Sequence, residues 1–305
     1  MMHRITDQIN FFKLILNHPL TRKRRTNTLL NWLFWKIGSR LVPGDVLVPY
    51  VNNTLLLVRP GMKGATLNIY VGLAEFNDMS FISHVLRPDD IFYDIGANIG
   101  VYTILASGVC GATSVSIEPI QSTFERLKQN VRLNKLDELV KLIHGAVGQE
   151  KGFIKMTTDL DTTNHAVSES EDNLQFACEV PVFTIDAIAG NSIPQCIKID
   201  VEGFEANVLK GAKETLSSEN LMAVIMELNG SGKRYGISDE HIHKTMLAND
   251  FSTFEYNPFT RELINLNRSM NPNNGNTLYI KNDAVGKIKE RVKTASSFIV
   301  KQIKI

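Results

Sequence analysis

An aspartate, two glycines and an asparagine lie close together in the segment FYDIGANIGVYT, residues 92–103. Gly96 and Gly100 let the backbone turn sharply and approach a ligand closely. The segment follows an apolar run typical of a strand and precedes a run typical of a helix, so the first amides of that helix point toward the turn. Ligands of open α/β sheets bind at such a turn. The sequence therefore predicts a ligand-binding loop, the alternative being a turn that only packs.

A second acidic residue indicates what the loop holds. Glu118 ends the next strand-like run and lies 18 residues after Gly100. At that place a carboxylate can accept hydrogen bonds from both hydroxyls of a ribose. We therefore expect a ligand that contains adenosine.

Two cofactors with adenosine fit this prediction, a nicotinamide dinucleotide and S-adenosylmethionine. Dinucleotide loops have a glycine against the pyrophosphate, in the pattern G-x-G-x-x-G, whereas Asn98 occupies that position here. Asp94 would repel a diphosphate but attract the sulfonium and ammonium groups of S-adenosylmethionine. No Gly-Lys-Ser/Thr follows the loop, so the Walker pattern is absent. The residues favour S-adenosylmethionine and leave a nicotinamide-dependent oxidoreductase as the alternative.

The surrounding chain alternates between apolar strand-like runs and helical stretches from about residue 89 onward. This alternation is typical of a mostly parallel sheet with helices on both faces. Upstream, residues 45–72 predict two strands around an Asn-Asn turn and the start of a helical region. A polar insertion at 151–186 interrupts the alternation, and such insertions often face the substrate. Near the end, STFEYN and TLYIK predict two strands joined as an antiparallel hairpin.

Composition limits the class of protein. The 305 residues are 43% hydrophobic, which suffices for a buried core. The net charge of +1 conceals two basic ends around an acidic middle, which is a poor match for a nucleic-acid backbone, so no nucleic acid is expected as partner. Three cysteines without a CxxC pair argue against a disulfide framework or a zinc ribbon and fit a cytoplasmic protein.

The motifs together resemble one family. FYDIGANIGVYTILAS, SIEP, NVRLN, GAVG, TNHAV and VPVFTIDAI occur in this order, and IKIDVEGFEANVLKGA is the most specific of the set. With these residues the chain resembles the FkbM family of S-adenosylmethionine-dependent methyltransferases over about residues 65–281. The first motif alone is common to most class I methyltransferases.

The resemblance implies an α/β fold, a doubly wound and mostly parallel seven-stranded sheet of the Rossmann-like class I methyltransferase type, with an antiparallel last strand. It implies a hydroxyl acceptor, such as a sugar or another small natural product. It also implies cofactor contacts at the loop, with Glu118 on the ribose and Ala146 and Val147 at the adenine edge. The loop contacts are Asp94, Gly96, Ala97, Asn98 and Gly100.

Polar side chains at two later strand ends are expected to complete the site. In CIKIDVEGFE the alternation places Lys198 and Asp200 on one side of a strand, with Glu202 in the loop beyond. Glu227 and Asn229 end the next strand in the same way. Transfer to a neutral hydroxyl needs alignment and a place for the proton, so we expect Asp200 or Glu202 to orient the acceptor or to act as base. Lys198, Glu227 and Asn229 are expected to contact the acceptor.

Several of these residues have alternative interpretations. His165 of the insertion is the competing base because its unperturbed pKa lies near neutrality, or else a surface histidine; Asn164 beside it is expected to contact the acceptor. Lys198 has a structural alternative, an ion pair with a carboxylate such as Glu227. Glu205 is expected in the solvated first turn of the next helix. Three of the carboxylates are adequate Mg²⁺ ligands in kind, but the family resemblance does not suggest a metal, so none is expected.

The two basic ends are expected to form parts separate from the methyltransferase domain. Residues 28–40 predict an amphipathic helix that either packs on the body, which we favour, or lies on a membrane with Trp32, Phe34 and Trp35 at the interface. The tail predicts a second amphipathic helix that packs, joins a homodimer or contacts an anionic membrane. Neither a transmembrane helix nor a secretory signal is expected. The parts are an N-terminal segment (1–44), strands and a helix leading into the core (45–88), the methyltransferase domain (89–282) and a basic C-terminal helix (283–305).

The preferred function is therefore S-adenosylmethionine-dependent O-methylation of a small hydroxyl compound. One alternative is the nicotinamide-dependent oxidoreductase. The other is a non-catalytic protein that binds the cofactor and serves as a scaffold.

Overall fold

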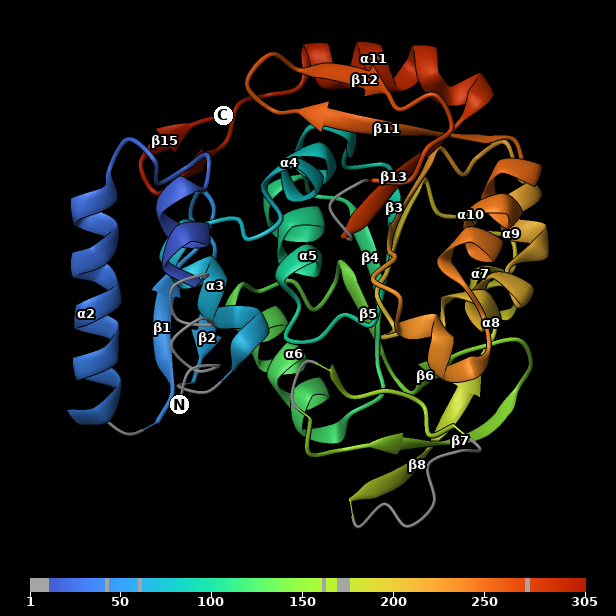
Figure 1. Ribbon diagram of the computed structural model, residues 1–305, viewed down its shortest axis with the longest axis horizontal. Coiled ribbons are helices and arrows are strands. Elements are labelled where there is room, and N and C mark those ends of the chain that lie inside the picture. Colours follow the sequence, from blue (N-terminus) through green and yellow to red (C-terminus); the bar gives the residue numbers. More distant parts are fainter. Residues whose placement is uncertain (1–10, 42–43, 60–61, 161–162, 169–175, 272–274) are drawn as a thin grey trace.

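The computed structural model describes residues 11–41, 44–59, 62–160, 163–168, 176–271 and 275–305. A single large sheet forms the centre, and helices cover both of its faces (Figure 1). Its strand order is β12-β11-β13-β10-β9-β3-β4-β5. The strands are β3 (Ile91–Ile95), β4 (Thr113–Glu118), β5 (Val140–His144), β9 (Cys196–Ile199), β10 (Ala223–Glu227), β11 (Phe251–Asn257), β12 (Glu262–Asn265) and β13 (Asn276–Lys281).

The sheet is mostly parallel, as the sequence pattern predicts. Strands β5, β4, β3, β9 and β10 run in one direction, and β13 is antiparallel to both β10 and β11. The core strands are buried along nearly their whole length because neighbouring residues enter opposite layers. Phe92 packs in the layer on one face and Tyr93 in the layer on the other, and neither is more than 1% exposed.

Two helical layers enclose the sheet. On one face lie α4 (Phe76–Val85), α5 (Val101–Thr103), which continues as a π-helix over Ile104–Val109, α6 (Gln121–Leu133) and α11 (Val285–Thr294). On the other lie α7 (Ile185–Ala189), α8 (Glu205–Lys210), α9 (Lys213–Ser217) and α10 (Asp239–Ala248). This arrangement is the doubly wound α/β fold of class I methyltransferases.

The prediction of seven strands and of a direct hairpin at the edge is wrong in two details. An eighth strand, β12, follows β11 and pairs with it antiparallel at the outer edge, so β11 and β13 are neighbours without being joined directly. The side chain of Asn257 accepts the backbone N–H groups of Phe259 and Thr260, at 3.0 and 3.4 Å, and Arg261 has a φ of +61°. These contacts close a tight turn that brings β12 back along β11.

The predicted insertion, residues 151–186, forms a small sheet together with the segment just before it. Strands β6 (Ala146–Val147), β7 (Gly152–Thr157) and β8 (Ala177–Phe183) pair in the order β6-β8-β7, with β8 parallel to β6 and antiparallel to β7. This sheet lies beyond the carboxyl ends of the central parallel strands, at the bottom of Figure 1.

The N-terminal elements lie beside the central sheet. They are α2 (Arg25–Leu41), the antiparallel pair β1 (Val46–Pro49) and β2 (Leu55–Val58), and α3 (Lys63–Val71). The predicted turn between the two strands is present, with Asn52 at a φ of +51°. Two asparagines, one in α6 and one directly after it, satisfy the free edge of β2, since Asn134 and Asn130 accept the N–H groups of Leu55 and Leu57 at 2.8 and 2.6 Å.

The tail is helical only in its first half, which corrects the prediction of a helix over residues 283–305. Helix α11 ends at Thr294, where the guanidinium of Arg261 donates to the carbonyls of Val292 and Ala295 at 3.0 and 2.8 Å. Beyond it, β14 (Ile299–Val300) and β15 (Ile303–Lys304) form a hairpin, and Val300 is fully buried. Within the described residues, no helix is both long enough and apolar enough to pass through a bilayer.

Candidate functional site

Two cavities meet beyond the carboxyl ends of β3 and β9. The insertion cavity lies toward the small sheet and is lined by Glu118, Ala146, Val147, Ile154 and Met156 among others. The acidic cavity lies toward α4 and α5 and is lined by Glu75, Asp94, Tyr102, Lys198 and Glu227 among others. Both are also lined by the four residues of their junction, Gly96, Asn98, Asp200 and Glu202.

The glycine of the loop is required by the close approach of two strand ends. Gly96 has a φ of +79°, and a Cβ atom at this position would overlap the carbonyl oxygen of Asp200. The N–H of Asp200 donates to the carbonyl of Ile95 at 3.0 Å, which keeps β9 against β3 where both end. The backbone at the junction is therefore fixed by main-chain contacts.

Glu118 is positioned by the loop that it faces. Its two carboxylate oxygens accept the N–H groups of Asn98 and Ile120, each at 3.0 Å, and Asn98 has a φ of +50°. Burial raises the pKa of Glu118 to about 7. Each oxygen keeps a second lone pair, so the carboxylate can also accept hydrogen bonds from a ligand in the insertion cavity.

Asp94 supports the start of the helix after the loop. Its carboxylate accepts the backbone N–H and the hydroxyl of Thr103, at 3.0 and 2.6 Å. Burial raises its pKa to about 6, although these hydrogen bonds oppose the shift. Asp94 and Ala97 line the acidic cavity, as expected of the loop residues. Gly100 lines neither cavity and serves the turn, with a φ of +92° and Leu127 behind it.

Lys198 places a positive charge next to Asp200, one of the four residues of the junction. Its Nζ lies 3.1 Å from Asp200 Oδ2 and donates to Asn276 Oδ1, also at 3.1 Å. Burial alone would lower the pKa of Lys198, but the neighbouring carboxylates outweigh it and raise the pKa above its usual value. The lysine therefore stays charged and pairs with Asp200, not with Glu227. The predicted alternation along β9 is confirmed by this contact.

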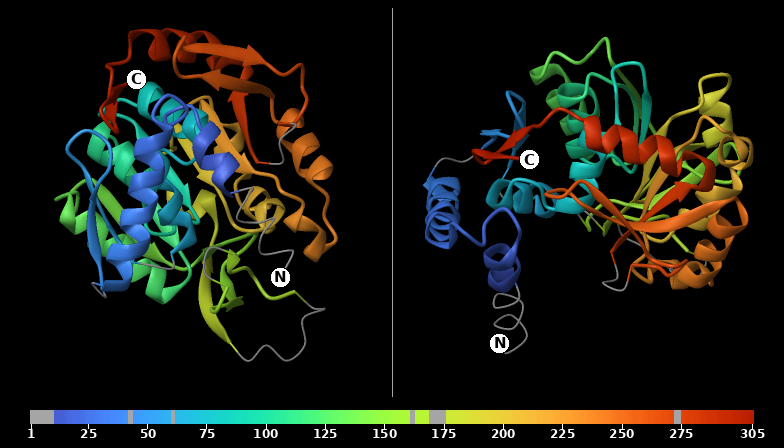
Figure 2. Two further views of the ribbon diagram at one scale, coloured as in Figure 1. Left: turned by 60° about the vertical axis from the view of Figure 1, so that its left-hand side comes forward. Right: turned by 90° about the horizontal axis from the view of Figure 1, so that it is seen from above.

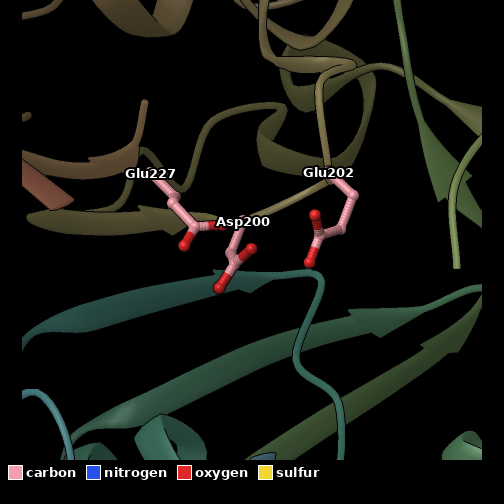
Figure 3. A group of neighbouring side chains, drawn as sticks. All are labelled: Asp200, Glu202 and Glu227. Atoms are coloured by element: carbon pink, nitrogen blue, oxygen red, sulfur yellow. The ribbon is translucent and has the colours of Figure 1, made fainter. Parts of the chain in front are cut away.

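Three carboxylates converge beside this ion pair. Asp200, Glu202 and Glu227 can each place one oxygen within 4.8 Å of the others (Figure 3). Burial and the charge of Asp200 raise the pKa of Glu227 to about 9 and that of Glu202 to about 7. Near neutral pH, Glu227 therefore carries a proton, whereas Glu202 exchanges one readily.

Backbone packing and hydrogen bonds fix the turn that carries Glu202. Glu202 has a φ of +53° and Gly203 one of +104°, where a Cβ atom would meet the carbonyl of Ser231 at 2.6 Å. The carboxylate of Glu205 accepts the N–H groups of Gly203 and Val201, at 3.0 and 3.4 Å. Glu205 lies in the first turn of α8, as predicted, but it is only 4% exposed, so the prediction that it is solvated is wrong.

A family model described as the methyltransferase FkbM domain matches residues 94–253, more than half of the chain. The chain belongs to the FkbM methyltransferase family. The matched segment contains the loop, Glu118 and the turn of Asp200 and Glu202, so the family motifs coincide with the junction of the two cavities.

The proteins similar to this FkbM chain have different names. Hexuronic acid methyltransferase AglP of Haloferax volcanii is 28% identical over 177 residues, covering 55% of this chain and 65% of that protein. The 2,3-bisphosphoglycerate-independent phosphoglycerate mutase of Methanococcus vannielii is 22% identical over 235 residues, covering 72% and 50%. A crystal structure of an FkbM methyltransferase from Methylobacillus flagellatus is 18% identical, with a TM-score of 0.44, covering 64% and 44%. The chain thus spans less than two thirds of each relative's length.

Two further residues expected at the FkbM site line neither cavity. His165 is 4% exposed, and its Nδ1 lies 2.9 Å from the carbonyl of Thr163. Its neighbour Asn164 does line the insertion cavity. Asn229 is exposed and accepts the N–H of Ser231 at 3.0 Å, because the chain turns away after Glu227 and the alternation ends with the strand.

The residues on the far wall of the acidic cavity were not predicted from the sequence. Glu75, Tyr102 and Asn68 line it, and the hydroxyl of Tyr102 donates to Glu75 Oε2 at 2.6 Å. The side chain of Asn276 also donates to this oxygen. Glu75 lies in the upstream segment NIYVGLAEFNDM, where a single acidic residue before a helix gives no signal by itself.

Proposed function

We propose that this FkbM protein transfers a methyl group from S-adenosylmethionine to a hydroxyl oxygen of a sugar or another small hydroxyl compound. The observation that carries the proposal is the junction, where two cavities of different chemistry share Asp200 and Glu202. A cofactor that extends from the insertion cavity through the junction, and an acceptor bound in the acidic cavity, would meet at these carboxylates. Methyl transfer requires such a meeting, because the enzyme mainly has to align and desolvate the two reactants.

The insertion cavity has the chemistry of an adenosine site. Apolar side chains line it together with one buried carboxylate, that of Glu118, at the end of β4. The ring system of adenine suits the apolar wall formed by Ile154 and Met156, and the ribose hydroxyls suit Glu118. The methionine part would pass the open backbone at Gly96 toward Asp94, whose negative form favours the ammonium and sulfonium charges.

The acidic cavity has the chemistry of a hydroxyl acceptor site. Carboxylates accept hydrogen bonds from sugar hydroxyls, and a concentration of acidic groups disfavours an acceptor that is anionic at the reacting end. The relative named as a hexuronic acid methyltransferase supports a sugar as the acceptor class.

The chemistry assigns a different role to each carboxyl group. Asp200, which lies 3.1 Å from the ammonium of Lys198, orients the hydroxyl. Glu202 takes the proton as the new oxygen–carbon bond forms and the sulfur–carbon bond breaks, and the sulfur leaves as a neutral thioether. Glu227 carries a proton near neutrality and can donate a hydrogen bond to a second acceptor oxygen.

Calorimetric titration tests the cofactor. The protein is expected to bind S-adenosylmethionine and not NAD, and Glu118→Gln should weaken binding by roughly 10- to 100-fold because hydrogen bonds to a charged group are lost. Glu179→Gln, an exposed carboxylate on β8, is the matched control and should bind normally. Binding of NAD alone would favour the oxidoreductase, and cofactor binding without turnover on any acceptor would favour the scaffold.

Cofactor binding should also release protons. In the unliganded protein, Glu118 and Glu202 have pKa values near 7 and are partly protonated at neutral pH. A positive ligand favours the carboxylate form, so it lowers these pKa values and drives protons off. Titrations at pH 7 in buffers of different ionisation enthalpy should show more protons released by S-adenosylmethionine than by S-adenosylhomocysteine, which lacks the sulfonium charge. Equal release by both ligands would place the sulfonium away from these groups.

A further inference from the structure

The outer face of α2 is apolar although it is turned away from the core. Its large side chains are exposed, with Phe34 at 67% and Leu41 at 75%. Contiguous exposed apolar surface of this kind marks an interaction site in soluble proteins. This outer apolar face consists of Leu29, Leu30, Leu33, Phe34, Ile37 and Leu41.

The opposite face of the same helix already packs on the protein. Thr28 is buried, and Trp32 meets the ring of Phe12 edge to face at 4.9 Å. Trp32 and Trp35 are half-buried and pack against the core, which confirms for these two residues the favoured interpretation that the helix packs on the body, whereas Phe34 is exposed. Helix α2 lies at the edge of the molecule in Figure 1 and in the view from above in Figure 2. Among the residues that the structure describes, the outer face is therefore not used for packing.

Positive charge surrounds the outer apolar face. No acidic residue occurs between Asp7 and Asp45, whereas seven lysines and arginines do. All seven are exposed, and none forms an ion pair with a carboxylate of the described residues. They are Lys13, Arg22, Lys23, Arg24, Arg25, Lys36 and Arg40.

We propose that the outer apolar face of α2 docks the protein onto an anionic lipid bilayer. The helix lies in the plane of the interface, with its apolar side chains at the boundary of headgroups and acyl chains and its cations among the phosphates. Amphipathic helices with basic flanks bind membranes in this way, and the attraction grows with the anionic lipid content. This inference is independent of the proposed function.

Two observations favour a bilayer over a second copy of the chain. In a twofold dimer the same patch meets itself, so Lys36 and Arg40 of both copies would approach one another with no acidic residue on α2 to balance them. An anionic bilayer satisfies the apolar and the cationic groups together. A cavity of about 300 Å³ also opens beside Leu30 and Phe34, and Arg24 and Asn31 line it, which suits a polar headgroup.

Flotation of the full chain with lipid vesicles tests the proposal. The protein should float with vesicles of phosphatidylcholine and phosphatidylglycerol, much less with phosphatidylcholine alone, and high salt should release it. The double variant Leu33→Ser/Phe34→Ser should reduce the bound fraction by roughly tenfold. Phe153→Ser is the matched control, since Phe153 is 73% exposed on β7, far along the chain from α2.

A second pair of variants tests the charge. Lys36→Glu/Arg40→Glu should abolish the preference for anionic vesicles, whereas Lys287→Glu/Lys289→Glu on the basic helix α11 should retain it. Equal flotation of all variants, or no binding by the original protein, would overturn the proposal. A dimer in light scattering without lipid, dissociated by Leu33→Ser/Phe34→Ser, would make the face a subunit interface instead. Unchanged thermal unfolding of each variant shows that it has folded.

Discussion

Replacing Glu202 with glutamine is expected to lower the turnover number by about 10²- to 10⁴-fold, the usual loss when a positioned base is removed. Glutamine keeps the size of the side chain and tolerates the turn, but it cannot take a proton. Cofactor affinity should stay near that of the unmodified protein, because the adenosine site at Glu118 is unchanged. The rates are measured by methyl transfer to the best acceptor of a sugar panel, and Glu179→Gln is the control for loss of a carboxylate elsewhere.

The pH profile distinguishes a base from a positioning group. Because burial and Asp200 raise the pKa of Glu202 to about 7 without ligand, and a positive cofactor lowers it, the rate of the original protein should rise with pH up to a limit at or below pH 7. Glu202→Gln should remove this rise. A variant that is slow but keeps the same profile would show that Glu202 only positions the acceptor.

Asp200 is the less informative residue to remove. Its carboxylate pairs with Lys198, and the two side chains are 31% and 2% exposed, so Asp200→Asn would leave a buried ammonium without a paired negative charge. Loss of one member of a fully buried pair destabilises a protein by about 3–5 kcal/mol, and the partial exposure of Asp200 makes the expected loss smaller. A loss of rate in that variant would thus mix chemistry with unfolding, whereas Glu202 makes no ion pair among the described side chains.

The parts of the site that the sequence predicted are those set by local geometry. Gly96, Asn98 and Glu118 follow from the turn between a strand and a helix and from the length of that helix, so spacing alone places them. The position of Lys198 and Asp200 on one side of β9 follows from the two-residue repeat of a strand, although the ion pair was expected with a carboxylate such as Glu227. These rules act within a few residues or within one strand–helix unit.

The parts that the sequence did not predict depend on contacts between distant segments. Glu75 joins the acidic cavity through α4, about 125 residues before Asp200, and only the folded chain shows that the two share a wall. Arg261 ends α11 by binding carbonyls more than thirty residues ahead, which no pattern within 283–305 reveals. The prediction for Asn229 fails for a different reason. The two-residue repeat holds only within a strand, and β10 ends at Glu227, two residues before Asn229.

Replacing Gly96 with alanine is expected to have the largest effect on the site as a whole. A methyl group there would overlap the carbonyl oxygen of Asp200, and a φ of +79° is unfavourable for alanine. Because the obstacle is backbone and not a flexible side chain, the ends of β3 and β9 must separate. Overpacking of this kind destabilises a protein by at least about 1–3 kcal/mol, or roughly 2–10 °C in Tm.

The same displacement should abolish cofactor binding, because Gly96 lines both cavities and the backbone there forms the path between them. Gly152→Ala is the matched control. Gly152 begins β7, has no atom near an added methyl group and should keep its Tm and its affinity for S-adenosylmethionine. If Gly96→Ala matched this control in both thermal unfolding and cofactor titration, the close approach of β3 and β9 could not be what shapes the junction. Loss of binding with a lowered Tm in Gly96→Ala alone would show that the backbone contact between these two strand ends holds the junction in the form that the cofactor requires.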